Sequence, residues 1–271
     1  MRKMEKVDSK EVGLEIGLLL TRFFFNSEDL HFGYWPDGTT TDMSTISKAQ
    51  SNHSNLIFSH IPDGVKNILD VGSGSGELAK KLIDKGYSVD CVSPSSFLSD
   101  TIQSKLPPQS TLYRTTLEDL ETDHRYDLII FSESFQYVKI RSGLSKCNHL
   151  LNHNGHLLIC DFFSIETGSK SPLRGGHKMS KFVETIDQFT FKNIIDLDIT
   201  KETAPTIGIL DKLLTEFLIP SKDLSSKYLS SNFPMITKLL KWKLKKRIEK
   251  INHVYMSGQI TAESFIKHKS Y

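Results

Sequence analysis

The chain has 271 residues, enough for one large α/β domain with additions or for two small domains. Its 34 Lys and Arg nearly balance its 32 Asp and Glu, which excludes a global basic field for nucleic acid and leaves only a local patch. Three cysteines at long spacings fit neither a disulfide framework nor a zinc site. We therefore predict a cytoplasmic protein without a metal.

Residues 1–60 are predicted to form a helical N-terminal cap. Their apolar run, Val12–Phe25, begins beside Glu11, contains Glu15 and is interrupted by Arg22, so it fits neither a signal peptide nor a membrane span. An amphipathic helix packed on the domain fits better. An aromatic loop, Leu30–Trp35, follows it.

Residues 61–165 alternate between strand and helix patterns and are predicted to form the core. Strands are expected over Asn67–Val71, Ser88–Ser93, Ser110–Thr115, Tyr126–Ser132 and His156–Phe162. Helices are expected over Glu77–Lys85, Phe97–Lys105 and Ser142–Leu151, the last followed by a turn at Asn152–Gly155. This alternation predicts a doubly wound α/β fold with a mostly parallel, seven-stranded, Rossmann-like sheet. Ligands of such sheets bind outside the carboxyl ends of the strands.

Residues 166–271 are predicted to add a lid and the final strands of the same domain. Phe191–Ile199 and Ser264–Tyr271 have strand patterns, whereas Leu210–Phe217 and Ile236–Ile251 have helix patterns. Lysines surround an apolar stripe in Lys238–Ile251. This segment fits a lid helix with a solvated basic face, and the alternative is weak contact with a membrane surface.

A glycine-rich turn, Asp70–Gly76, joins the first predicted strand to a helix. Glycines let the backbone turn tightly, and the free N–H groups of a helix N-terminus favour an anionic group such as a carboxylate. The spacing D-x-G-x-G-x-G differs from the dinucleotide fingerprint. It resembles the first motif of class I S-adenosylmethionine (SAM)-dependent methyltransferases of the small-molecule type. That resemblance implies that Asp70, Gly72, Ser73 and Gly74 cradle the methionine part of SAM.

Two further stretches resemble the cyclopropane-synthase-like group, which includes lipid and sterol methyltransferases. Thr45–Gln50 (TISKAQ) resembles its T-x-x-x-A-Q stretch, and Ser93 stands where other methyltransferases place an acid on the ribose. The resemblance implies that Gln50 and Ser93 belong to the cofactor site and that Tyr34 folds over the cofactor. A ring face suits a sulfonium, although ordinary cap packing is the alternative for Tyr34.

The adenine end of the cofactor is expected near Leu117–Leu120 (LEDL). This stretch resembles the family segment that passes the adenine, so Leu117 and Glu118 are implied as contacts. The alternative for the acids here is a pair at a helix N-terminus. Ser132, at the end of the fourth predicted strand, completes the expected cofactor-binding residues.

Three residues are candidates for the chemistry. Methyl transfer to an O or C atom usually needs a base, and Glu133 and Tyr137 follow the fourth strand, where substrate and methyl group should meet. His177 follows two glycines in a later loop and is the third candidate. The alternative for Glu133 is a strand-end residue bonded to backbone, and for His177 an exposed loop histidine.

Together these features predict a methyltransferase that moves a methyl group from SAM to a small, apolar or amphiphilic lipid, isoprenoid or natural product, leaving S-adenosylhomocysteine. An O or C acceptor is expected before an N acceptor, and Gln136, in place of a family glutamate, argues against cyclopropane formation. Nucleic-acid methylation and a non-catalytic SAM-fold binding protein are the alternatives. No nucleic-acid partner is expected, and the chain is expected to be a monomer or homodimer.

Overall fold

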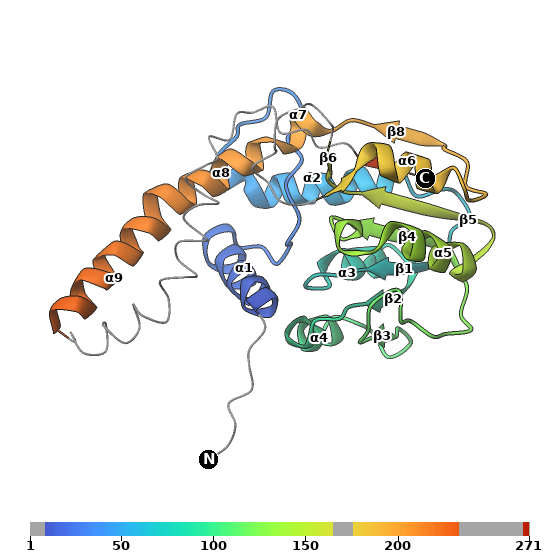
Figure 1. The fold of residues 1–271 in the computed structure, drawn as a ribbon, viewed down its shortest axis with the longest axis horizontal. Helices are drawn as coiled ribbons and strands as arrows, with labels where there is room; N and C mark the ends of the chain where they lie inside the picture. The colour runs from blue at the N-terminus through green and yellow to red at the C-terminus, as the bar shows by residue number, and fades with distance from the viewer. Residues whose placement is uncertain (1–8, 165–175, 233–267, 271) are drawn as a thin grey trace, which may run out of the picture. The chain divides into compact units, whose positions relative to one another are not determined.

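The computed structural model describes residues 9–164, 176–232 and 268–270 (Figure 1). Its described elements fall into two compact units. The first holds all the strands and helices α1 to α7, with α7 at Thr200–Thr203. The second holds α8 (Pro205–Leu213), the π-helical turn η3 (Leu214–Leu218) and α9 (Ile219–Asn232). The predicted cap helices therefore share a unit with the sheet.

A parallel sheet forms the centre of the first unit. Its strands are β1 (Asn67–Val71), β2 (Ser88–Val92), β3 (Leu112–Tyr113), β4 (Tyr126–Ser132) and β5 (Leu151–Cys160), in the order β3-β2-β1-β4-β5. In this register Asp70 lies beside Cys91 on β2 and Ile130 on β4. From β1 the chain adds β2 and β3 on one side of the sheet and then returns to add β4 and β5 on the other side. The direction in which strands are added therefore reverses between β1 and β4, and a ligand-binding crevice is expected at this point.

The main sheet has five strands instead of the predicted seven when only strands joined by parallel pairings are counted. Five strands make up the parallel body, and only two short strands, β9 (His268–Ser270) and β8 (Ile195–Leu197), continue it beyond β5. Both of their pairings are antiparallel. A separate two-stranded ribbon is formed by β6 (Phe163–Ser164) and β7 (His177–Lys178). The mostly parallel Rossmann-like arrangement is confirmed.

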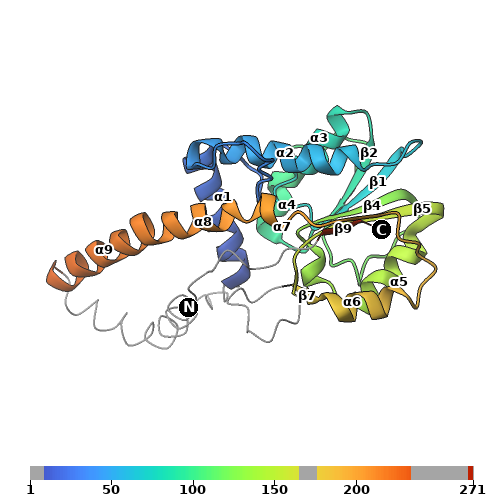
Figure 2. The same cartoon turned by 90° about the horizontal axis from the view of Figure 1, so that it is seen from above.

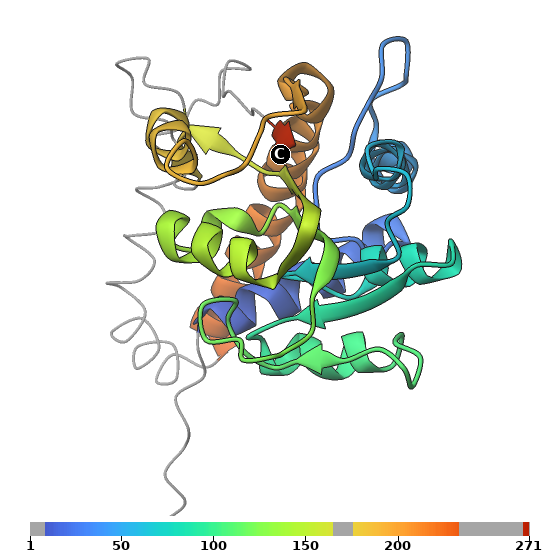
Figure 3. The same cartoon turned by 90° about the vertical axis from the view of Figure 1, so that its right-hand side faces the viewer.

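Helices cover both faces of this sheet (Figure 2). One face carries α1 (Ser9–Phe25), α2 (Ile46–Ser59), α3 (Glu77–Asp84) and α4 (Ser96–Gln103), and the other carries α5 (Ile140–Leu150) and α6 (Met179–Ile186). Figure 3 shows the green and yellow α5 and α6 on the side of the sheet away from the blue α2.

The alternation of side chains along β4 explains the two layers. Leu128 and Ile130 join the core under α1 to α4, whereas Ile129 and Phe131 join the core under α5 and α6. All four are fully buried, and burying each is worth about 1.5–3 kcal/mol. A strand that is apolar on both faces can be stable only between two layers of helices.

Several predicted boundaries were wrong. The expected turn at Asn152–Gly155 is part of β5, which begins at Leu151, and Asn154 takes a left-handed φ of +62° within that strand. The pairing of β4 with β5 shifts in the same place, so an irregular strand looked like a turn in the sequence. The helix expected over Leu210–Phe217 begins earlier, with Pro205 in its first turn. The predicted helix and basic run at Ile236–Ile251 lie outside the described residues.

All three cysteines are buried. Cys147 lies in the core under α5 and α6, whereas Cys91 and Cys160 lie in the core under α1 to α4. Burial raises the pKa of each thiol. Within the described residues, no helix combines the length and the apolar character that crossing a membrane requires.

Candidate functional site

The glycine turn after β1 has a backbone that side chains would obstruct. Gly72 and Gly76 have φ of +73° and +83°, the left-handed region that glycine adopts without strain. A Cβ on Gly72 would lie 2.4 Å from the Cβ of Ser134, because the chains leaving β1 and β4 touch here. Ser134 Oγ donates to the Val71 carbonyl at 2.5 Å. Gly76 then caps α3, which begins at Glu77.

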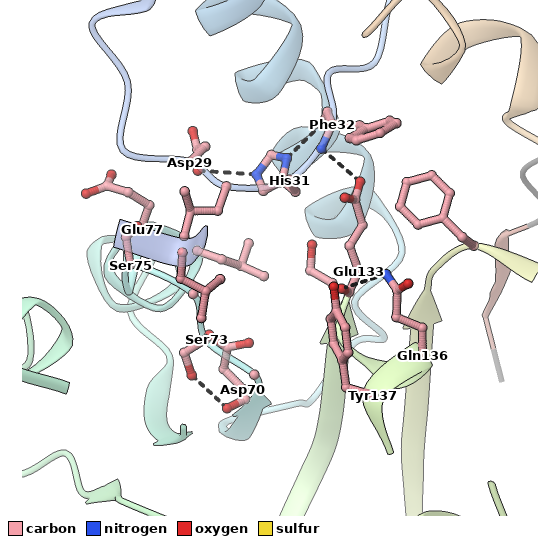
Figure 4. Close-up of a pocket in the computed structure, with 17 residues that line it drawn as sticks. Asp29, His31, Phe32, Asp70, Ser73, Ser75, Glu77, Glu133, Gln136 and Tyr137 are labelled. Carbon is pink, nitrogen blue, oxygen red and sulfur yellow. Dashed lines mark hydrogen bonds and ion pairs between the residues drawn. The ribbon is translucent and has the colours of Figure 1, made fainter. Parts of the chain in front are cut away.

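A cavity of about 270 Å³ lies beside this turn (Figure 4). The turn and the start of α3 form one side, and the residues after β4 form another. The loop that follows α1 closes it with Asp29, His31 and Phe32. The predicted site residues that line it are Asp70, Gly72, Ser73, Gly74, Ser132, Glu133 and Tyr137.

Two oxygens on this wall are buried without a hydrogen-bond partner in the described part of the chain: Asp70 Oδ2 and Ser132 Oγ. Burial raises the pKa of Asp70 to about 7, although a hydrogen bond from Ser73 and the charge of His31 act in the opposite direction. A buried carboxylate without a partner is costly. Asp70 is therefore suited to receive a cationic group of a ligand.

Glu133 occupies a strained position at the end of β4. Its φ of +55° is unusual for a residue with a side chain, and such outliers cluster at functional sites. Its Oε1 accepts a hydrogen bond from the Phe32 N–H at 2.9 Å. Burial raises the pKa of Glu133 to about 8, against the charge of His31 and the Phe32 N–H. Such a carboxyl can exchange a proton near neutral pH.

The structure adds a cluster of three charged side chains, Lys81, Asp29 and His31, that the sequence did not indicate. Lys81 Nζ donates to both Asp29 oxygens, at 2.9 and 2.7 Å, and His31 Nε2 lies 3.2 Å from Asp29 Oδ1. Burial would raise the pKa of Asp29, but His31 and Lys81 bring it well below its usual range. The sequence pattern of this loop indicated only its aromatic residues. No local pattern predicts that Asp29 pairs with a lysine on α3.

A second contact fixes the same loop to the glycine turn. Lys105 Nζ lies 2.5 Å from Glu28 and 2.6 Å from Glu77, and it donates to the Ser75 carbonyl at 2.8 Å. Ser75 Oγ donates to the Glu28 carbonyl at 2.5 Å. The loop after α1 is thus held against the cavity from two sides.

Gln50 and Tyr34 do not line the cavity. Gln50 Nε2 donates to the carbonyls of Asp29 and His31, both at 3.0 Å, so its amide holds the loop after α1. Tyr34 is half-buried, and its N–H donates to the Ala49 carbonyl.

The other predicted residues also lie outside the cavity lining. The Ser93 hydroxyl accepts from the Ser95 N–H at 3.4 Å. Leu117 belongs to the core, and Glu118 accepts from the Lys139 N–H at 2.9 Å. His177 Nε2 lies 3.1 and 2.8 Å from the carbonyls of Phe135 and Val138, so this nitrogen holds a turn. Within the described residues, no group of three His, Cys, Asp or Glu could hold a metal ion.

The sequence of this region identifies its class. Residues 69–157 match the family model described as a methyltransferase domain. They run from β1 through the glycine turn to β5, and this part of the chain is a methyltransferase domain.

Curated relatives agree over a limited length. A protein of Geobacillus sp. (strain WCH70) that is named as a methyltransferase is 30% identical over 135 residues, 47% of this chain and 54% of the relative. An uncharacterized methyltransferase of Mycobacterium tuberculosis (strain ATCC 25618 / H37Rv) is 25% identical over 97 residues, 36% of this chain and 40% of the relative. The chain therefore spans about half the length, or less, of these relatives.

Solved structures share the fold. The [4+2]-cyclase SpnF is similar with a TM-score of 0.65 and 14% identity, over 96% of this chain and 94% of that chain. Geranyl diphosphate C-methyltransferase from Streptomyces coelicolor A3(2), in complex with geranyl diphosphate and S-adenosylhomocysteine, has a TM-score of 0.59 and 14% identity, over 73% and 86%. At these identities the likeness concerns the fold alone.

Proposed function

We propose that the protein transfers a methyl group from SAM to an O or C atom of a small organic molecule and releases S-adenosylhomocysteine. The observation that carries this proposal is the buried, unpartnered Asp70 oxygen beside the glycine turn of a methyltransferase domain. Asp70 would hold the ammonium of the cofactor, and the N–H groups around Gly72–Gly76 would meet its carboxylate. The ammonium and the carboxylate of the cofactor would thus each contact a group of opposite polarity on the same wall of the cavity.

Glu133 is the proposed proton acceptor. When bound, SAM supplies a methyl group on a positively charged sulfur, already activated for in-line displacement. Glu133 takes the proton of the acceptor O–H or C–H, and the freed electron pair forms the bond to the methyl carbon while the carbon–sulfur bond breaks. Ser132, whose buried hydroxyl has no partner in the described part of the chain, orients the molecule beside it.

Aromatic rings near Glu133 support an apolar or amphiphilic acceptor. The rings of Phe32 and Phe162 meet edge to face, with centroids 4.8 Å apart, and both residues line the cavity. Tyr137, 78% exposed, lines the same cavity. The geranyl diphosphate methyltransferases with this fold make an isoprenoid one reasonable class to test.

A second candidate function is cofactor binding without methyl transfer. Ser93, in place of the ribose acid, lies outside the cavity lining and hydrogen-bonds within its own turn. The [4+2]-cyclase with this fold carries a name for a different reaction. The fold alone therefore does not choose between the two functions.

Calorimetric titration with S-adenosylhomocysteine tests the shared first step. We expect binding to the wild type and binding at least tenfold weaker to Asp70→Asn, because the ammonium loses its charged partner. Asp84→Asn, at the exposed end of α3, is the control and should bind normally. A wild type that does not bind refutes both functions.

The second step separates the candidates. The protein is incubated with methyl-labelled SAM and a panel of isoprenoid and phenolic alcohols. Label transfer by the wild type and its loss in Glu133→Gln, with binding of S-adenosylhomocysteine retained, supports the methyltransferase. Binding without transfer to any acceptor favours the second candidate.

A further inference from the structure

The His31 ring lies between two acceptors. Its Nδ1 is 2.8 Å from the Phe32 carbonyl oxygen, which can only accept, so Nδ1 carries a hydrogen. Its Nε2 lies 3.2 Å from Asp29 Oδ1, an ion-pair distance, although the described structure gives this nitrogen no hydrogen-bond partner. A carboxylate at this distance favours a proton on Nε2 as well, so the geometry favours the imidazolium form of the ring. Lys81, bonded to both Asp29 oxygens, keeps that carboxylate ionised.

The same stretch of backbone holds Glu133. The N–H that follows the His31 carbonyl belongs to Phe32 and donates to Glu133 Oε1 at 2.9 Å (Figure 4). The carbonyl of this peptide accepts from Gln50 Nε2 at 3.0 Å. A peptide that accepts at its oxygen donates more strongly at its N–H, since linked hydrogen bonds polarise one another. Gln50 and His31 thus fix the donor that meets the carboxyl.

We propose that His31 is a positioning residue, a fixed imidazolium that favours the ionised form of Glu133 and so prepares this carboxyl to accept a proton. The inference rests on the role given to Glu133 in the proposed function. His31 is buried, with its side chain 7% exposed, so water screens its charge poorly. Glu133 is also buried, with its side chain 9% exposed.

Other titratable groups also face Glu133. His53 on α2 has its Nε2 3.9 Å from Glu133 Oε1, Asp161 follows β5, and Tyr137 lies on the 3-10 turn Phe135–Tyr137. The charge of Asp161 opposes that of His31. The rings of His53 and His31 stack with centroids 4.4 Å apart, so two positive charges there would repel. Asp29 lies 3.2 Å from His31, closer than the 3.9 Å between Glu133 and His53, so we place the charge on His31.

The protonation state can be observed in the wild type. In nitrogen-15 spectra of the histidine-labelled full chain, assigned with His31→Gln, we expect both His31 ring nitrogens to be protonated at pH 7. A neutral ring at pH 7 overturns the proposal. Because this measurement uses the wild type, it remains decisive even where the variant does not fold.

The coupling is measured on Glu133 itself. With glutamate labelled at its carboxyl carbon, Glu133 is assigned by Glu133→Gln and titrated in each variant. His31→Gln should raise the Glu133 midpoint by about one pH unit or more, since a nearby opposite charge typically lowers such a pKa by that amount. His31→Lys, which keeps a positive charge, should return the Glu133 midpoint most of the way to its wild-type value. His60→Gln, at the C-cap of α2, is the matched control and should change nothing.

A folded His31→Gln protein with an unchanged Glu133 midpoint refutes the coupling. A role limited to packing would change stability without moving this midpoint. Neither experiment contains SAM, so failure here leaves the calorimetric result on S-adenosylhomocysteine intact. Conversely, absence of cofactor binding would remove the proposed function and leave the coupling measurable.

Discussion

Asp70 lies near the end of β1 and Glu133 directly follows the neighbouring strand β4, and burial gives both carboxyls unusual proton affinities. The pKa of each is raised mainly by loss of water, to about 7 for Asp70 and about 8 for Glu133. Their immediate partners differ. Glu133 accepts a backbone N–H, whereas Asp70 keeps an oxygen without a partner in the described structure. Glu133 therefore suits proton exchange, and Asp70 suits pairing with a cation.

Binding of S-adenosylhomocysteine should strengthen as the pH rises from 6 to 8. An ammonium pairs with the ionised form of Asp70, so binding expels a proton where Asp70 is still protonated. Titration calorimetry in two buffers of different ionisation enthalpy measures that proton. In Asp70→Asn both the pH dependence and the released proton should disappear. An equal pH dependence in this variant would assign it to another group.

Local motifs made part of the site predictable. Asp70, Gly72 and Ser73 lie in one continuous turn whose spacing has a physical meaning, so the sequence could indicate them. The contact of Lys81 with Asp29 joins residues far apart in the chain, and neither has a pattern that selects the other. The motif predicted Gln50 as a cofactor residue, and in the structure its amide donates to backbone carbonyls of the neighbouring loop and does not line the cavity.

At the scale of elements, the glycine turn depends on a close approach between β1 and β4. Gly72→Ala should destabilise the fold by about 1–3 kcal/mol and weaken binding of S-adenosylhomocysteine, because its Cβ meets Ser134 at 2.4 Å. Gly64→Ala is the matched control, since Gly64 has a similar φ of +83° but nothing within 4 Å of the added carbon. Urea unfolding measures both variants. Equal losses would show that backbone strain, not contact, is the cause.

Lys105 connects the loop after α1 to α3. Lys105→Met leaves the carboxylates of Glu28 and Glu77 facing each other without the shared cation, so we expect faster hydrogen exchange in residues 28–32. Lys80→Met removes a half-exposed lysine on α3 whose ion pair in the described structure is with Asp84, and it should leave exchange unchanged. Unchanged exchange in Lys105→Met would show that other contacts suffice to hold the loop.

The order of strands and helices could be predicted, whereas some of their ends could not. Tyr126–Ser132 has a continuous apolar run in its centre, a pattern typical of a strand buried on both faces. The start of β5 was missed because Asn152–Gly155 contains residues typical of turns, while its pairing with β4 is decided by tertiary contact. The domain limits at residues 60 and 165, and the lid, remain predictions.

For the whole molecule without ligand, the buried acids set the pH dependence of stability. Asp70, Glu133 and Asp161 have folded pKa values of about 7, 8 and 7, above the value of about 4 expected when unfolded. Their contribution is complete below pH ~4 and is lost as the pH rises through 7–8, because the folded state binds the protons more tightly. Asp29 has a lowered pKa in the folded state, so its contribution to stability is present near neutral pH and is lost as the pH falls into the acid range.

Asp70→Asn should therefore be more stable than the wild type at pH 8 and nearly equal to it at pH 5. Thermal unfolding of the protein without ligand at the two pH values measures this difference, with Asp84→Asn as the control. The physical reason is that asparagine never acquires the buried charge. An equal loss of stability at both pH values would contradict the assignment.

The distribution of the cysteines gives the molecule internal probes of opening. Cys147 lies under one helical layer, and Cys91 and Cys160 lie under the other, all hidden from water. A thiol reagent should modify them only after a layer has separated from the sheet. Mass spectrometry of partly modified protein then shows whether Cys147 reacts together with the other two. Modification of all three at one rate would mean that the two layers open as a single cooperative unit, and separate rates would rank the layers by how readily each lets water in.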